Sequence, residues 1–336
     1  MSLSHEIDKD VYDITIVGGG PAGLFAAFYS GIRNMKTKLI EASPHLGGQL
    51  ATLYPDKYIY DVPGYVKIPA QELVKKLEEQ ALQFNPTVIL NEKVIALRRL
   101  EEKLIELETT KGLHYSKTVL LATGAGAISM KKLGIPSIER FEGKGVYYSV
   151  TNKWAFRGKK VMIVGGGDSA IDWALNLKDI ASEVMLAHRR AVFRAQEAKV
   201  MEIFHSDVRM LIPYIVKDAH GTEKLETVTL INTETGEEIT LEVDALIPQI
   251  GYEMDNSLYR SWGLDVDERG VRVNGRMETN IPGVFAAGDI ASPIDSIKLN
   301  LITIGFSQAI IAVNCAKHYV DPSAPVFPGH TAKLRL

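Results

Sequence analysis

The sequence predicts an α/β fold in which short parallel strands alternate with helices. Three observations support this prediction. An apolar strand at Tyr12–Val17 runs into a glycine-rich turn and then into apolar residues at helical spacing. The same pattern returns at Lys159–Val164 and the glycines that follow it. Further short apolar runs, separated by polar turns, follow each of these two units, as expected for the other strands of two sheets.

The first glycine turn has the G-x-G-x-x-G spacing of a dinucleotide-binding motif, GGGPAG. Gly18 permits the tight turn, Gly20 lets the backbone approach a pyrophosphate, and Gly23 lets the helix pack closely on the strand. Pro21 suits the first helical position, because its missing N–H would have no helical partner there. An ordinary glycine-rich turn without a ligand remains the alternative for this motif taken alone.

The residue that follows the next strand identifies the nucleotide. The expected strand Thr37–Ile40 ends at Glu41, about 20 residues after the glycines, where a ribose hydroxyl finds its acceptor. A carboxylate accepts hydrogen bonds from hydroxyl groups but repels a 2′-phosphate. The first site is therefore predicted to suit FAD or NAD rather than NADP.

The stretch Ala42–Tyr65 is rich in Gly, Pro and Tyr and lacks helical spacing, so we expect a loop. Gly47 and Gly48 would allow backbone to lie close to a ligand. The Gln49 amide can pair with the polar edge of a heterocycle, and Tyr54 offers a flat face. These residues make the loop a candidate part of the first nucleotide site.

The second glycine turn, GGGDSA at Gly165–Ala170, again fits the dinucleotide motif. The strand after it, Glu183–Ala187, ends in basic residues rather than in an acid. Arginine at this place binds the 2′-phosphate of NADP, often through two parallel hydrogen bonds. A solvated basic run is the alternative. The candidate residues are His188, Arg189, Arg190 and Arg194.

Other elements follow from apolar spacing. We expect helices over Pro69–Phe84, Gln196–Phe204 and Leu301–Tyr319, and strands over Thr87–Leu90, Lys93–Leu100, Lys103–Thr109, Thr118–Leu121, Gly270–Val273 and Val284–Ala287. Residues 209–243 are expected to form a β-meander with turns at Asp218–Gly221 and Thr235–Gly236. Two strand ends add candidate FAD contacts, namely Thr123 and Gly124 after one strand and Gly288 and Asp289 after another.

Composition excludes several classes of protein. The chain has 336 residues, 46% of them hydrophobic, which is enough for two domains. A net charge of −3 gives no sign of nucleic-acid binding or of a polybasic membrane anchor. No apolar run reaches the ~18 residues of a membrane span, and the polar start, Met1–Asp10, is expected to be a loose arm rather than a signal peptide. The single cysteine, Cys315, excludes an internal disulfide and favours a reducing, cytoplasmic location.

The motifs occur in an order that resembles the pyridine-nucleotide disulfide reductase-like flavoproteins. The matching segments are GGGPAG (Gly18–Gly23), ATG (Ala122–Gly124), GGGDSA (Gly165–Ala170), HRR…FRA (His188–Ala195) and TNIPGVFAAGD (Thr279–Asp289). The resemblance implies two Rossmann-like nucleotide-binding domains of three-layer ββα type, with an NADPH domain (126–250) inserted into an FAD domain (1–125 and 251–336). Segment lengths are similar to those of low-molecular-weight bacterial thioredoxin reductases.

One departure indicates the function. Thioredoxin reductases have a C-x-x-C pair just before the second glycine motif, whereas Ser149–Trp154 here contains no thiol. The chain instead resembles the bacterial thioredoxin-reductase-like ferredoxin–NADP⁺ reductases, through Gly47–Gly64 (GGQLxxLYPxKYIYDVxG) and a C-terminal extension, Val320–Leu336. That resemblance implies hydride transfer between NADPH and FAD and single-electron exchange with ferredoxin, without a catalytic side chain. The alternatives are a reductase of flavodoxin, free flavin, quinone or a small disulfide, or a non-enzymatic flavin- and NADP-binding sensor.

The resemblance also implies site residues and an assembly. Tyr54 and His330 would stack on opposite faces of the flavin, in a homodimer in which each tail covers the flavin of the partner subunit. The implied FAD contacts are Gly18, Gly20, Pro21, Ala22, Gly23, Glu41, Gly48, Gln49, Tyr54, Val94, Thr123, Gly124, Ile128, Gly288, Asp289 and Thr331. The implied NADPH contacts are Gly165, Gly167, Asp168, Ser169, Ala170, His188, Arg189, Arg190 and Arg194. No metal, nucleic acid or membrane partner is expected.

Overall fold

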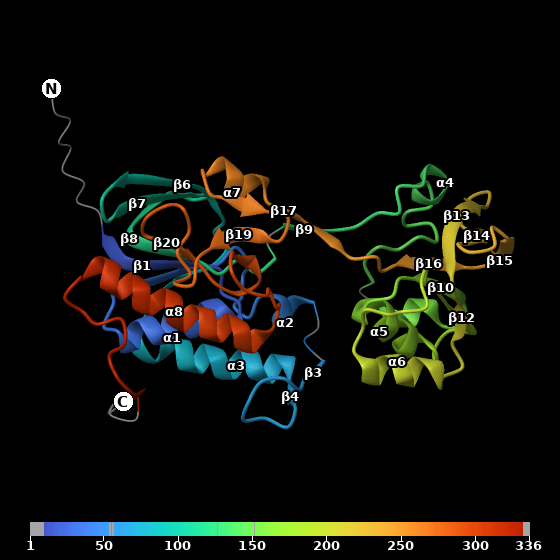
Figure 1. Ribbon diagram of the computed structural model, residues 1–336, viewed down its shortest axis with the longest axis horizontal. Helices are drawn as coiled ribbons and strands as arrows, with labels where there is room; N and C mark the ends of the chain where they lie inside the picture. Colours follow the sequence, from blue (N-terminus) through green and yellow to red (C-terminus); the bar gives the residue numbers. More distant parts are fainter. Residues whose placement is uncertain (1–9, 54, 56, 126, 151, 332–336) are drawn as a thin grey trace. The chain divides into compact units, whose positions relative to one another are not determined.

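The computed structural model describes residues 10–331 except 54, 56, 126 and 151 (Figure 1). The chain divides into two compact units. Unit 1 comprises Met1–Ala127 and Met254–Leu336, and unit 2 comprises Ile128–Glu253. The connecting strands, β9 (Ala127–Met130) and β17 (Tyr252–Asp255), pair with each other. The second unit is thus an insertion into the first.

Unit 1 is built on a mainly parallel sheet with the order β5-β2-β1-β8. On the far side of β8, β20 pairs in parallel with its C-terminal half, and β7 pairs antiparallel with its N-terminal half. β6 continues the antiparallel part. The carboxyl ends of β1, β8 and β20 therefore lie at the same edge of the parallel part, and Gly18, Thr123 and Gly288 follow these strands. The strands are β1 (Val11–Val17), β2 (Thr37–Ile40), β5 (Thr87–Ile89), β6 (Val94–Glu101), β7 (Leu104–Thr109), β8 (Leu113–Leu121) and β20 (Val284–Ala286).

Three helices cover one face of this sheet: α1 (Pro21–Ile32), α3 (Ala70–Ala81) and α8 (Ile302–Val320). They lie side by side, with α1 in contact with both others (Figure 1). Apolar residues of α3 at helical spacing, Leu73, Val74 and Leu77, face the core, which explains why the segment forms this helix. Cys315 is buried in α8 and 3% exposed, and burial raises the pKa of its thiol.

Shorter elements complete unit 1. They are α2 (Gln49–Thr52), β3 (Tyr58–Ile59), β4 (Ile68–Pro69), a 3₁₀ turn at Leu82–Phe84, α7 (Ser257–Ser261), β18 (Val266–Asp267), β19 (Gly270–Val273), a 3₁₀ turn at Gly288–Ile290 and β21 (Ala291–Pro293). The expectation of an unbroken loop over Ala42–Tyr65 was wrong. The short α2 forms within it because Thr52 N–H and Leu53 N–H donate to Gly48 O and Gln49 O, and β3 forms because it pairs with β4.

Unit 2 has three layers. A parallel sheet of order β12-β11-β10-β16 lies between helices α5 and α6 and an antiparallel meander β13-β14-β15. Alternate residues of β10 face the two sides, Ile163 toward the helices and Met162 toward the meander. The elements are α4 (Pro136–Glu139), a 3₁₀ turn at Lys153–Phe156, β10 (Lys160–Val164), α5 (Asp168–Leu177), β11 (Glu183–Ala187), α6 (Glu197–Phe204), β12 (Arg209–Leu211), β13 (Tyr214–His220), β14 (Thr227–Asn232), β15 (Glu238–Glu242) and β16 (Ala245–Pro248).

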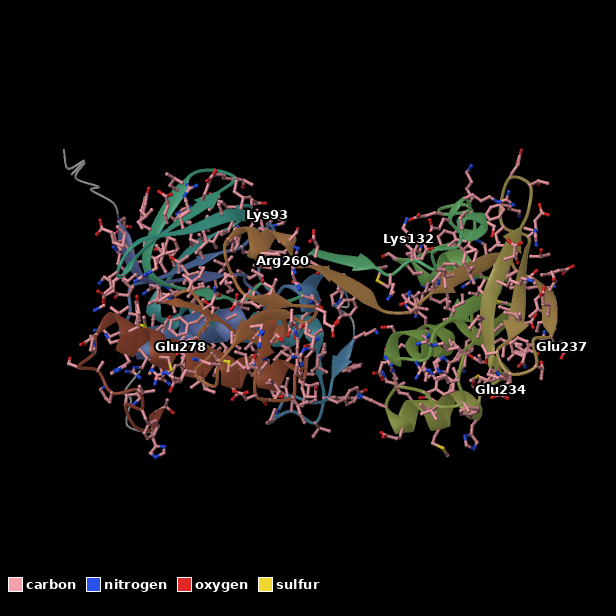
Figure 2. All side chains as sticks on the ribbon, turned by 45° about the horizontal axis from the view of Figure 1, so that its top comes forward. Lys93, Lys132, Glu234, Glu237, Arg260 and Glu278 are labelled. Carbon is pink, nitrogen blue, oxygen red and sulfur yellow. The ribbon has the colours of Figure 1, made fainter. Side chains whose placement is uncertain are left out.

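The meander of unit 2 corrects one predicted turn. Asp218–His220 belong to β13, which is bulged between Val216 and Asp218, so the connection to β14 begins at Gly221 rather than at Asp218. The polar composition of this stretch hid the strand, because an exposed meander face is itself polar. The predicted turn at Thr235–Gly236 is confirmed, and the glutamates beside it, Glu234 and Glu237, point into solvent (Figure 2).

Candidate functional site

The first glycine turn has the backbone that its motif predicts. Gly18 has φ +108°, and a Cβ there would lie 2.4 Å from Ala122 O. A Cβ at Gly23 would lie 1.9 Å from Gly18 O. Gly20 precedes Pro21 at the first position of α1, and no side chain caps that helix. The first-turn N–H groups of α1 therefore remain available for an anion.

Glu41 ties this turn to the loop after β2. Its side chain is 8% exposed, and each carboxylate oxygen accepts a backbone hydrogen bond of 2.7 Å, one from Gly19 N–H and one from Ser43 N–H. Gly47 N–H also donates to Gly19 O, at 2.8 Å. Lone pairs remain on both carboxylate oxygens to accept ribose hydroxyl groups. The sequence predicted Glu41 but not Ser43, whose contact is made by its backbone.

Gly48 and Gln49 border the same turn. Gly48 has φ +56°, and a Cβ there would lie 2.9 Å from Gly20 Cα, so the two backbones form a narrow cradle. Gln49 begins α2, and its Nε2 would lie 3.4 Å from a Cβ placed on Gly124. The loop, the glycine turn and the end of β8 are thus brought together, as expected. Tyr54, the predicted stacking residue, lies outside the described residues.

The strand end at Gly288 closes another side of the cradle. Gly288 has φ +77°, and a Cβ there would lie 3.2 Å from the Cβ of Ala22. Gly305 lies in the first turn of α8, and a Cβ placed on it would lie 3.3 Å from the same Ala22 Cβ. The Gln308 side chain accepts the Gly288 N–H at 2.8 Å. The start of α8 therefore lies beside the start of α1, a contact that no local pattern revealed.

Asp289 is half-buried next to this turn. Burial raises the pKa of its carboxyl above the usual value, and the charge of Lys298 opposes that shift. The Lys298 ammonium donates to the carbonyl oxygens of Asp289, at 2.5 Å, and Arg269. These bonds hold the exposed segment around Lys298, just before α8, against the rest of unit 1. Lys298 is thus engaged with backbone carbonyl groups rather than directed at a ligand.

The remaining candidate FAD residues lie in four places. Thr123 Oγ1 is 2.7 Å from the hydroxyl of Tyr259, a buried tyrosine whose pKa is raised by burial. Val94 is buried at the start of β6. Ile128 belongs to β9, but its side chain lies outside the described ones. Thr331, the last described residue, is exposed in the tail.

The second glycine turn repeats the geometry of the first. Gly165 has φ +152°, and a Cβ there would lie 2.3 Å from Gln249 O and 2.9 Å from Ala170 Cβ. Gly167 precedes α5, no side chain caps that helix, and a Cβ at Gly167 would meet no atom within 4 Å. Ser169 is exposed in the first turn. This open helix start again suits a pyrophosphate.

The loop after β11 folds back onto that turn. The His188 ring covers Gly166, because a Cβ there would lie 2.1 Å from His188 Cε1. Arg194 N–H donates to Gly166 O at 2.7 Å, and Gln196 N–H donates to the Asp168 carboxylate at 3.1 Å. Asp168 therefore anchors the arginine loop, residues 188–196, which carries Arg189, Arg190 and Arg194.

The arginine loop is strongly positive. Burial lowers the pKa of His188, the hydrogen bond to Val192 O opposes that shift, and the charges of Arg189, Arg190 and Arg194 lower the pKa further. The three arginine side chains are exposed, and no described carboxylate bonds to them. Unpaired guanidinium groups beside an open helix start have the charge and the hydrogen-bond donors that suit a doubly charged phosphate.

The predicted tail residue His330 is exposed and meets the ring of Phe327 edge-on, with 5.5 Å between ring centroids. The tail is held by Arg33, at the end of α1, which donates to Val326 O and Pro325 O at 3.1 and 2.7 Å. In the described part of the chain, no group of His, Cys, Asp and Glu could hold a metal ion. None of the described helices is long and apolar enough to cross a membrane.

Two cradles of the same design, one flanked by a carboxylate and one by arginines, define a protein that binds two different dinucleotides. The comparisons make this specific. A family model described as pyridine nucleotide-disulphide oxidoreductase matches residues 12–314. The chain belongs to this family.

Similar proteins match this chain over nearly its full length. A ferredoxin–NADP reductase of Geobacillus thermodenitrificans is 46% identical over 99% of this chain and 100% of its own. Ferredoxin–NADP reductase 2 of Shouchella clausii is 48% identical over 97% and 98%. Among solved structures, Lactococcus lactis thioredoxin reductase has a TM-score of 0.79 at 28% identity, covering 92% of this chain and 99% of that one. The fold class predicted from the motifs is confirmed.

Proposed function

We propose that this protein is a ferredoxin–NADP⁺ reductase that uses FAD and NADPH. The observation that carries the proposal is the pair of glycine cradles with opposite charge, Glu41 beside one and Arg189 beside the other. FAD, when bound, supplies the chemistry that links a two-electron hydride donor to a one-electron protein acceptor. The full-length relatives named ferredoxin–NADP reductase support the choice of acceptor.

The unit 1 cradle fits FAD. A Cβ at Gly48 would fill the space against Gly20, so the motif keeps this surface free of side chains. The first-turn N–H groups of α1 would bind the pyrophosphate, and Glu41 would accept from the adenosine ribose. Asp289, Gln49 and Thr123 would contact the rest of the cofactor, and Lys298 holds the segment beside Asp289 in place.

The unit 2 cradle fits NADPH. The first turn of α5 would bind the pyrophosphate, and Arg189, Arg190 and Arg194 would bind the 2′-phosphate. His188 packs on the glycine turn, and Asp168 fastens the arginine loop, so these two residues position the arginines. The lowered pKa of His188 disfavours a further positive charge beside the three arginines.

The acceptor lies outside the chain. The sequence contains one cysteine, Cys315, which is buried in α8, so the chain has no thiol pair to relay electrons to a disulfide. This separates the protein from its thioredoxin reductase neighbours. Flavodoxin would be a second protein acceptor of the same one-electron type. The low cysteine content also favours the cytoplasm, where such carriers are reduced.

We further propose a homodimer in which the tail serves the partner subunit. Arg33 holds the tail at the C-terminal end of α1, whereas the glycine cradle lies at the N-terminal end of that helix. The 12 residues of α1 span about 18 Å. The four residues from Phe327 to His330 span at most about 13 Å. His330 therefore cannot reach the cradle of its own subunit while Arg33 holds the tail.

Steady-state turnover with NADPH and a panel of acceptors tests the proposal. The panel contains ferredoxin, flavodoxin, free flavin, a quinone and a small disulfide. We expect the highest kcat/KM with ferredoxin, followed by flavodoxin. A higher kcat/KM with the quinone or the disulfide would contradict the assigned acceptor while leaving the two cofactors in place. Equilibrium sedimentation of the FAD-loaded protein checks the dimer.

A further inference from the structure

We propose that Arg33 is a latch that fixes the C-terminal tail on α1 and α8 and thereby presents His330 to the FAD site of another subunit. The latch rests on this structure alone, and the presentation rests on the proposed function. Arg33 does not belong to the FAD or NADPH site described above. It acts on the tail from the end of α1 opposite to the glycine cradle.

The bonding of Arg33 is unusual for a surface arginine. Its side chain is 6% exposed, although it lies at the C-cap of α1. One guanidinium nitrogen, Nη1, donates to Asn314 Oδ1 of α8 and to Val326 O. The other, Nη2, donates to Pro325 O. One planar fork thus joins the end of α1, the middle of α8 and two consecutive carbonyl groups of the tail.

Its electrostatic setting explains why an arginine is needed. Burial lowers the pKa of the guanidinium, but arginine remains charged at any physiological pH. No described carboxylate neutralises it, so its charge is satisfied by carbonyl oxygens and by the negative end of α1. Carbonyl groups held this way cannot move without leaving a buried charge unpaired, which is costly. The tail is therefore fixed at Pro325 and Val326.

The chain around the latch leaves the end of the tail free to act. Before the latch, His318 and Asp321 bind the turn at the end of α8, with His318 Nδ1 2.8 Å from Ala324 O. After the latch, Phe327 is 65% exposed and packs edge-on against the exposed His330. Figure 1 shows the tail leaving α8 at the end remote from α2. A rigid anchor followed by an exposed aromatic pair is suited to insertion into a second subunit.

Amide hydrogen exchange on the full-length, FAD-loaded protein tests the latch. We compare wild type with Arg33→Met, with Arg33→Lys, and with Arg99→Met as a control for loss of an exposed arginine in the same unit. Arg33→Met should speed exchange in residues 322–331 by about tenfold or more, with α1 and α8 unchanged. Arg33→Lys should give a smaller increase, because one ammonium cannot replace the fork. Arg99→Met should match wild type.

Iodide quenching of FAD fluorescence tests the presentation. Arg33→Met and Arg33→Lys should raise the quenching constant several-fold at unchanged dimer mass, with the smaller rise for lysine. The latch would be overturned if Arg33→Met sped exchange equally in the tail and in α1 and α8, or left the exchange rate of the tail unchanged. If Arg33→Met does not fold, the same comparison is made with Arg33→Lys. Faster exchange in the tail with an unchanged quenching constant would overturn the proposal that the tail presents His330 to the FAD site of another subunit. Wild type that bound no FAD would contradict the proposed function, whereas the same exchange comparison on the FAD-free protein would still test the latch.

Discussion

Under the proposed function, a single position sets nucleotide choice, and it is occupied by Glu41 in unit 1 and by Arg189 in unit 2. Both follow the second strand of a strand–turn–helix unit, yet one is a buried carboxylate and the other an exposed guanidinium. Glu41 accepts hydrogen bonds from two backbone N–H groups, which fix the orientation of its carboxylate. Arg189 has no described acidic partner and can bind a phosphate without first breaking an ion pair.

Arg189→Ala is expected to raise the KM for NADPH about ten- to a hundredfold, because a charge-assisted hydrogen bond contributes about 1.5–3 kcal/mol. The KM for NADH should change by less than about threefold, since NADH has no 2′-phosphate. Steady-state kinetics with both nucleotides measures the ratio. Arg209→Ala, which removes a distant arginine of unit 2, serves as the control. Equal changes for NADPH and NADH would remove the assignment.

Residues whose role depends on distant segments were the ones the sequence could not predict. Arg33 and Asn314 lie 281 positions apart, and nothing near either residue signals the contact. Ser43 acts through its backbone N–H, and Gln308 reaches Gly288 from α8. By contrast, the positions of Glu41 and the arginines beside their glycine turns were predictable, because the distance from each turn follows from one strand and one helix.

At the scale of elements, the three glycines of the first turn have different physical tasks. Gly18 and Gly23 are required by the protein itself, since a Cβ at either would collide with backbone oxygen. Gly20 is not, because its φ is −75° and the nearest atom to a Cβ would be 3.8 Å away. The packing of the protein itself therefore does not require a glycine at position 20, and the missing side chain leaves this surface open, as the proposed pyrophosphate contact needs. The same contrast separates Gly165 from Gly167 in unit 2.

Gly20→Ala should weaken FAD binding at least about tenfold, equivalent to ~1.4 kcal/mol, while the apo-protein keeps the wild-type unfolding temperature. Gly112→Ala is the matched control, because a Cβ there meets nothing within 4 Å and the residue lies outside both motifs. Titration of apo-protein with FAD and thermal unfolding without FAD give the two values. Unchanged FAD affinity would show that the pyrophosphate does not approach Gly20.

Element boundaries were largely predictable where apolar spacing is strong. The predicted helix Leu301–Tyr319 is observed as Ile302–Val320, and the strands Thr37–Ile40 and Glu183–Ala187 have the predicted ends. Prediction failed where backbone turns rather than burial define the element, as for α2, and where a bulged strand is exposed, as at Asp218.

At the scale of the whole molecule, one unit is inserted into the other, and each unit provides one dinucleotide cradle. The order of the motifs made this arrangement predictable, because the first unit can be completed only by the strands after Gly251. What the order did not reveal is the anchoring of the tail, which depends on α1 and α8 lying side by side. The proposed dimer and the latch both follow from that packing.

Rapid mixing of the FAD-loaded protein with NADPH or NADH, without oxygen, tests the central claim most directly. The absorbance of the bound flavin reports reduction. We predict fast bleaching by NADPH, and bleaching by NADH that needs a much higher concentration to reach the same rate, because only NADPH engages the arginine loop. A protein that takes up no FAD, or a bound flavin that stays oxidised with both nucleotides, would contradict the account.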